Sequence, residues 1–115
     1  MNELTFSEAK EIYESMEANL DRKDKDYVNL YEKMQRSAVR YAHIRAGWYQ
    51  MAREKRLEED ERRTAAHDAF IASVNQVARS QGTAGALWRE RLGDDRKRIG
   101  DLACYIALFL GLQSR

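Results

Sequence analysis

Residues 63–79, RTAAHDAFIASVNQVAR, decide the fold of this chain, because they have the pattern of one amphipathic helix. At about 100° per residue, Phe70 and Val74 share one face of that helix. Arg63 and His67 fall on the same face. An arginine and a histidine within an apolar stripe need either buried partners or a functional site, because an unpaired buried polar group is costly. The segment therefore predicts a core helix, and Arg63 and His67 are the polar positions in its apolar face that need an explanation.

The composition favours helix over nearly the whole chain. The 115 residues include no proline, and strong helix formers such as Ala, Glu, Arg, Leu and Lys are abundant. A chain of this length is close to the commonest domain size and can bury a core without disulfides or metal ions. We therefore expect an all-α fold that forms a single helical-bundle domain over residues 1–115.

Four main helices and one short helix account for the apolar stripes. They are a first helix capped by Thr5 and Glu8, a long helix from Asp26, the helix that contains residues 63–79, a short helix near residues 86–92 and a last helix capped by Asp94 or Asp95. Gly82 and Gly85 end the third helix before the short one begins. Short links between such helices favour a bundle, in which each stripe packs against its neighbours.

The charged segment 53–63 lies between the second and third helices, and the apolar stripes on its two sides keep one continuous helical spacing across it. Many of its acidic and basic residues have i,i+4 spacing. One unbroken helix from Asp26 to Ser80 would be about 80 Å long, from the rise per residue of an α-helix. That is too long for a compact domain of this size, so we expect a break or kink near Leu57–Asp60. A continuous helix would instead indicate an elongated or intertwined dimer.

Polar side chains interrupt three of the apolar stripes. Arg45 lies in the second helix, Arg63 and His67 in the third, and Asp95 precedes the last one. If these faces meet, the four groups converge, and we interpret them first as a buried network of ion pairs and hydrogen bonds. A second interpretation is a ligand-binding pocket for a small anion or a nucleotide, with Arg45 and Arg63 as donors. In a third, these side chains are exposed at helix ends.

The charge balance and the single cysteine limit the classes of partner. With 20 basic and 19 acidic residues the net charge is +1, so no overall field draws the chain to nucleic acid or to an anionic membrane. Cys104 is the only cysteine and the N-terminus has no signal-peptide pattern, so a cytoplasmic location is expected. The apolar run 102–112 is too short to span a bilayer. The large apolar side chains predict a homodimer formed through a helix face.

We expect no cofactor and no metal site. A di-metal carboxylate bundle needs Glu-x-x-His on two helices, and neither His43 nor His67 has that glutamate. A zinc site would need both histidines and Cys104, but His43 points away from the apolar face of its helix. Without a phosphate-binding glycine loop or a nucleophile motif, a non-enzymatic protein is expected. It would act by protein–protein contact or by binding a small ligand.

Arg62 and His67 form an Arg-x4-His motif, RRTAAH, that resembles the motif of HEPN ribonucleases. The resemblance implies a small all-helical dimer in which the Arg and the His act on the RNA phosphate and on the 2′-hydroxyl chemistry. It also implies a role in a defence or toxin–antitoxin system. Arg63 follows Arg62 where HEPN motifs usually place Asn, Asp or His. In this alternative, Arg62 and His67 are the catalytic pair and must lie exposed in a cleft near the dimer axis.

A second resemblance covers about the last two-thirds of the chain. Three segments, YAHIRAGW at 41–48, RTAAH at 63–67 and WRERLGDDRKRIGDLA at 88–103, resemble a family of short uncharacterised bacterial all-helical proteins. The resemblance implies a bacterial cytosolic helical domain. It implies no assigned activity, so no functional residue is carried over from it.

Overall fold

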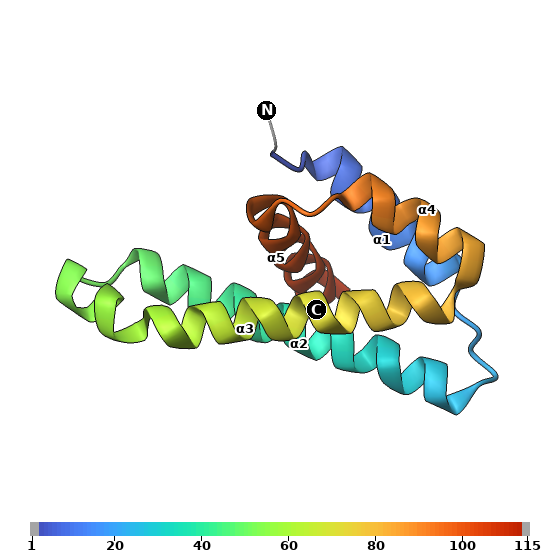
Figure 1. Ribbon diagram of the computed structural model, residues 1–115, viewed down its shortest axis with the longest axis horizontal. Helices are drawn as coiled ribbons and strands as arrows, with labels where there is room; N and C mark the ends of the chain where they lie inside the picture. Colours follow the sequence, from blue (N-terminus) through green and yellow to red (C-terminus); the bar gives the residue numbers. More distant parts are fainter. Residues whose placement is uncertain (1–2, 114–115) are drawn as a thin grey trace.

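The computed structural model describes residues 3–113, which form five α-helices and no strand. The helices are α1 (Phe6–Ala18), α2 (Lys25–Tyr49), α3 (Arg53–Ser80), α4 (Gly82–Leu92) and α5 (Arg96–Gln113) (Figure 1). The expected all-α fold, with four main helices and a shorter α4, is confirmed. Residues 1–2 and 114–115 of the predicted domain lie outside the described residues.

The helices α2 and α3 form an antiparallel hairpin along the longest dimension of the molecule, which is 46 Å (Figure 1). The chain reverses at residues 50–52, so the break or kink that was expected near Leu57–Asp60 is wrong in its position: α3 is continuous there. Arg56 fixes the reversal, since its guanidinium donates to the carbonyl oxygens of Trp48 (3.2 Å) and Tyr49 (2.9 Å). The bond to Tyr49 satisfies a carbonyl group that the end of α2 leaves without a helical partner, whereas the carbonyl oxygen of Trp48 also accepts from the backbone N–H of Met51.

The charged residues stabilise the first turns of α3 instead of breaking them. Lys55 lies 3.7 Å from Glu58 and 3.6 Å from Glu59. Arg63 lies 3.1 Å from Asp60. Pairs at i,i+3 and i,i+4 each contribute about 0.2–0.5 kcal/mol to an exposed helix. The segment that was expected to bend is therefore held straight by its own ion pairs.

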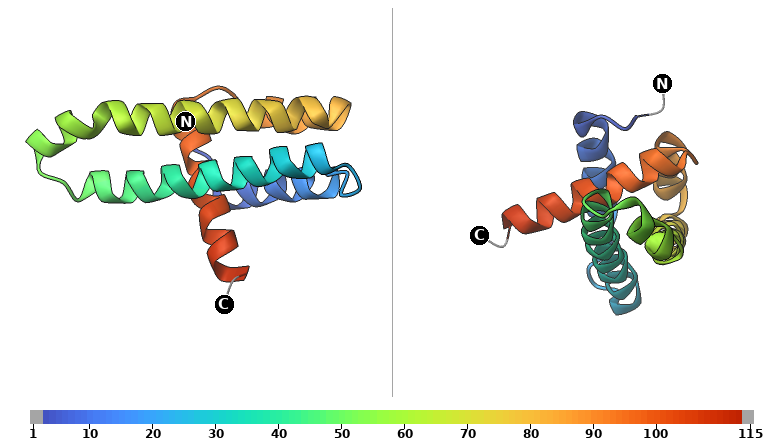
Figure 2. Two further views of the ribbon diagram at one scale, coloured as in Figure 1. Left: turned by 90° about the horizontal axis from the view of Figure 1, so that it is seen from below. Right: turned by 90° about the vertical axis from the view of Figure 1, so that its left-hand side faces the viewer.

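The helix α5 crosses the hairpin steeply, and its C-terminal half extends beyond α2 (Figure 2). The helix α1 packs against α4 and α5 (Figure 1). The side chains that are almost fully buried at these contacts are Ile12, Tyr13 and Met16 of α1, Met34 of α2, Phe70, Val74 and Val77 of α3, Leu92 of α4, and Ile99, Leu102 and Ile106 of α5. None of the helices within residues 3–113 combines the length and apolar character needed to cross a membrane.

A tight turn at Gly82, with φ at +59°, joins α3 to α4. The helix α4 begins at this residue, so it is longer than the predicted segment near 86–92. Gly85 lies directly against α3, and a Cβ atom placed on it would be 1.9 Å from the carbonyl oxygen of Ala78. The close approach of the two helices therefore requires a residue without a side chain at position 85.

Candidate functional site

Arg45 of α2 pairs with Asp101 of α5 and not with Asp95. Its Nη1 lies 3.3 Å from Oδ1 of Asp101 and 3.7 Å from Sγ of Cys104. The side chains of Arg45 and Asp101 are 17% and 20% exposed, so the pair is largely shielded from water. Burial raises the pKa of the Cys104 thiol, and the Arg45 guanidinium offsets this only in part. The thiol is therefore mostly protonated at neutral pH and is a poor nucleophile.

Arg63 stacks on Trp48 at the end of the hairpin. Its guanidinium carbon lies 4.5 Å from the centre of the Trp48 ring, and its Nη2 donates to Asp60 at 3.1 Å. The guanidinium of Arg56 lies 5.1 Å from the centre of the same ring. A cation over an indole ring contributes about 0.5–1 kcal/mol when it is partly exposed. Arg63 therefore stabilises the contact between the two long helices.

His67 is buried between α2, α3 and the start of α5, and only 2% of its surface is exposed. Its Nε2 lies 2.9 Å from the carbonyl oxygen of Arg96, so Nε2 carries the proton and donates it. The ring makes an edge contact with Tyr41 at 5.1 Å between ring centres. Burial lowers the pKa of His67, although the bond to Arg96 acts in the opposite direction. His67 is therefore a neutral core residue.

Asp95 caps α5 instead of pairing with an arginine side chain. Its Oδ1 accepts hydrogen bonds from the backbone N–H groups of Lys97 (2.9 Å) and Arg98 (3.2 Å). The sequence had given Asp95 as one of two candidate caps for this helix. The free N–H groups of a first helical turn lie within reach of its short side chain, which explains why they take the carboxylate.

The predicted network of Arg45, Arg63, His67 and Asp95 is therefore wrong in its pairing. Each residue has its own partner, and none of the hydrogen bonds or ion pairs found within residues 3–113 joins two of the four. Helical periodicity places a Cα atom on a face, but a long arginine side chain reaches partners well away from that face.

Arg62 and His67, the pair of the ribonuclease hypothesis, lie in different environments. The side chain of Arg62 is 57% exposed and lies 3.6 Å from Glu59. His67 is buried and bonded within its own chain. A ribonuclease of this type needs both side chains exposed in one cleft, so His67 does not meet the requirement.

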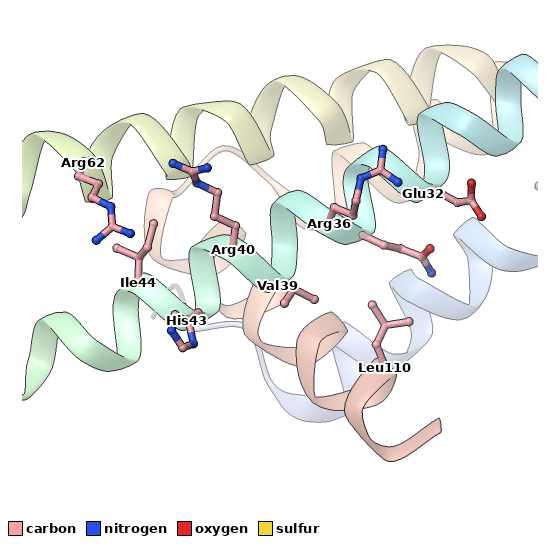
Figure 3. A pocket seen from close by; sticks show the side chains of 9 residues that line it. Glu32, Arg36, Val39, Arg40, His43, Ile44, Arg62 and Leu110 are labelled. Atoms are coloured by element: carbon pink, nitrogen blue, oxygen red, sulfur yellow. The ribbon is translucent and has the colours of Figure 1, made fainter. Parts of the chain in front are cut away.

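An open groove of about 740 Å³ lies between α2, the first half of α3 and the end of α5 (Figure 3). Its lining residues are Glu32, Gln35, Arg36, Val39, Arg40, His43, Ile44, Arg62 and Leu110. Most of them come from the face of α2 that α3 leaves uncovered. Two other surface cavities, of about 600 and 470 Å³, are smaller than this groove.

Three guanidinium groups and one carboxylate surround an apolar floor in this groove. Arg36 and Arg40 make no ion pair or hydrogen bond with any described residue. Both extend from α2, and Arg62 extends from α3 (Figure 3). Val39, between the arginines of α2, is 44% exposed. The groove therefore combines an unneutralised positive charge with an apolar surface that no other helix covers.

The apolar stripes do not reveal this groove, although the spacing of its basic residues is visible in the sequence. Arg36, Val39, Arg40 and His43 have the spacing i, i+3, i+4 and i+7, which places them on one helix face. A basic face with one apolar residue resembles an ordinary solvated surface until the position of α5 is known. Leu110 of α5 closes one side of the groove, and the sequence gives no indication of that contact.

Within residues 3–113, no three His, Cys, Asp or Glu side chains cluster in a way that could hold a metal ion. Comparisons with protein-family models, with curated proteins and with solved structures find no match to this chain. The geometry of the groove is therefore the main indication of what this chain does.

Proposed function

We propose that this chain is a non-enzymatic binding protein and that the groove between α2, α3 and α5 is its binding site. The observation that carries the proposal is the pair Arg36 and Arg40, which flank an exposed Val39 and have no partner among the described residues. Glu32 is the one carboxylate among the described residues that line the groove, so the guanidinium groups leave it with an excess of positive charge. A partner of negative charge would compensate for this excess.

The partner that fits best is an acidic amphipathic helix of a protein. Its carboxylates would pair with the guanidinium groups, which bind carboxylates through two parallel hydrogen bonds. Its apolar side chains would cover Val39 and Leu110, in the way that helices bind in grooves of other proteins. The groove is open to solvent instead of enclosed, which suits a helix better than a small molecule that needs an enclosed pocket.

A small anion held by Arg45 and Arg63 has less support. Arg45 is paired with Asp101, and Arg63 is paired with Asp60 and stacked on Trp48. An anion would have to displace these partners. The ribonuclease alternative is also less favoured, because the buried ring of His67 cannot reach a substrate without unfolding of the core.

The proposed setting is the reducing cytosol of a bacterial cell. Cys104 has no disulfide partner, since the chain contains no second cysteine. The net charge of +1 gives no preference for nucleic acid. Among the classes of binding partner, we therefore propose a protein whose acidic side chains complement the positive charge of the groove.

Fluorescence anisotropy with a labelled synthetic helix, which carries glutamates on one face and leucines on the other, tests the proposal. The wild-type chain should bind this peptide, and Arg36→Glu/Arg40→Glu should weaken binding at least about tenfold, or about 1.4 kcal/mol. Lys25→Glu/Arg79→Glu is the matched control, because it makes the same charge change at exposed positions outside the groove. Equal binding by both double variants, or no binding by the wild type, would contradict the proposal.

A further inference from the structure

We infer that the acidic helix accepted by this groove is the first part of α3 in a second copy of the same chain. The inference rests on the proposed function, because it names the occupant of the same groove. It is carried by a second surface of the molecule, which has the chemistry and the spacing that the groove requires.

That surface is an acidic face on α3 formed by Glu54, Leu57, Glu58 and Glu61. Leu57 is 71% exposed, the largest exposed fraction among the large apolar side chains of residues 3–113. Glu54 and Glu61 are exposed and have no partner in the described part of the chain. Glu58 lies 3.7 Å from Lys55, but both side chains are largely exposed, at 71% and 55%. The face therefore has two carboxylates without a partner among residues 3–113, and a third in an exposed ion pair, around one uncovered leucine.

The acidic face and the basic face of the groove have the same spacing. Arg36, Val39, Arg40 and His43 lie at i, i+3, i+4 and i+7, and so do the four residues of the acidic face. In both faces the apolar residue occupies i+3, and the ionisable residues occupy the other three positions. Each face extends over about 10 Å of helix. When the two helices lie side by side, Leu57 can cover Val39 while the carboxylates meet the guanidinium groups.

The positions of the two faces suit a dimer with two-fold symmetry. The acidic face lies near the free end of the hairpin, away from α1 and α4 (Figure 1). The groove lies farther along α2, next to α5 (Figure 3). One copy cannot bring its own acidic face into its own groove, since both lie on the outside of rigid helices. A two-fold axis would bring each acidic face to the groove of the other copy and would form the contact twice.

The overall charge of the chain permits such an association. With a net charge of +1, two copies repel each other only weakly, while the local faces attract. Contacts between exposed charges are screened by salt, so the dimer should weaken as the ionic strength rises.

Sedimentation velocity of charge-swapped variants tests this inference. The wild type should dimerise, whereas Arg36→Glu/Arg40→Glu and Glu58→Lys/Glu61→Lys should each be monomeric because like charges then meet in both contacts. An equimolar mixture of the two variants should regain the dimer, since every contact in the mixed pair joins opposite charges. Lys25→Glu/Arg79→Glu should dimerise like the wild type. Circular dichroism checks that all variants keep the helical fold.

The outcomes separate this inference from the proposed function. A wild type that stays monomeric while it binds the synthetic acidic helix would overturn the second copy as the occupant and leave the binding site standing. A monomeric wild type that also fails to bind the peptide would overturn both. A dimer that survives both double substitutions, or a mixture that fails to associate, would show that these two faces do not form the contact. Leu57→Ser should weaken the dimer, whereas Leu87→Ser, at a similarly exposed leucine outside the two faces, should not.

Discussion

Replacement of Gly85 by alanine should destabilise the fold through one identifiable contact. The added Cβ would lie 1.9 Å from the carbonyl oxygen of Ala78, 2.7 Å from its carbonyl carbon and 2.9 Å from its Cα. A carbon and an oxygen normally lie about 3.3 Å apart or more, so α4 must move away from α3 by more than about 1 Å. All three opposing atoms belong to the backbone, so no side-chain rotation can relieve the overlap.

The expected loss follows from two opposing effects. Overpacking of a close contact costs about 1–3 kcal/mol, with the upper end appropriate to a rigid backbone neighbour. Alanine regains about 1 kcal/mol over glycine in a helix. The net loss is about 2 kcal/mol, which corresponds to a fall in Tm of about 8 °C for a chain of this size.

Gly47→Ala is the matched control for this substitution. Gly47 lies in α2, and a Cβ added there meets no atom within 4 Å. The same chemical change should therefore stabilise the protein, by up to about 1 kcal/mol. Thermal and urea unfolding monitored by circular dichroism measure both variants. If Gly85→Ala is as stable as the wild type, or shifts in the same direction as Gly47→Ala, the close packing of α3 on α4 is refuted.

Other changes in the bundle should have smaller and equally specific effects. Asp95→Ala should lower the unfolding free energy by about 1 kcal/mol, because α5 loses its N-terminal cap; an unchanged urea midpoint would contradict the cap. Burial lowers the pKa of His67 from 6.5. The neutral ring therefore stabilises the folded state above that pH, and this contribution to the free energy of unfolding is lost as the pH falls below it. His67→Gln should therefore show a flatter dependence of stability on pH below about 6.5 than the wild type, and parallel curves would count against a buried neutral ring. The raised pKa of Cys104 should make its reaction with a disulfide reagent at neutral pH slower than that of the unfolded chain, and equal rates would contradict its burial.

The sequence was sufficient to predict the features of the fold that depend on local pattern. The stripe that contains Phe70 and Val74 is buried, and the capping box of Thr5 and Glu8 is present, with 3.1 Å between the Glu8 nitrogen and the Thr5 hydroxyl. Both features follow from residues within one or two helical turns of each other.

The features that depend on contacts between different helices were not predictable in the same way. The turn at residues 50–52 is held by Arg56, whose partners in α2 become apparent only when the hairpin has formed. The apolar stripe keeps its helical spacing from α2 into α3 although the chain turns between them. The sequence pattern therefore placed the break too late in the chain. The groove depends on where Leu110 of α5 lies beside α2, and a crossing angle between helices leaves no periodic signal in a single sequence.

The most direct test of the binding site is a titration of the isotopically labelled protein with the synthetic acidic helix, followed by amide chemical shifts. The largest shift changes should lie at Arg36, Val39 and Arg40 of α2, with smaller changes near Leu110, and raised salt should reduce them. Changes centred on α1 or α4, or no changes at saturating peptide, would contradict the assignment of the groove as the binding site.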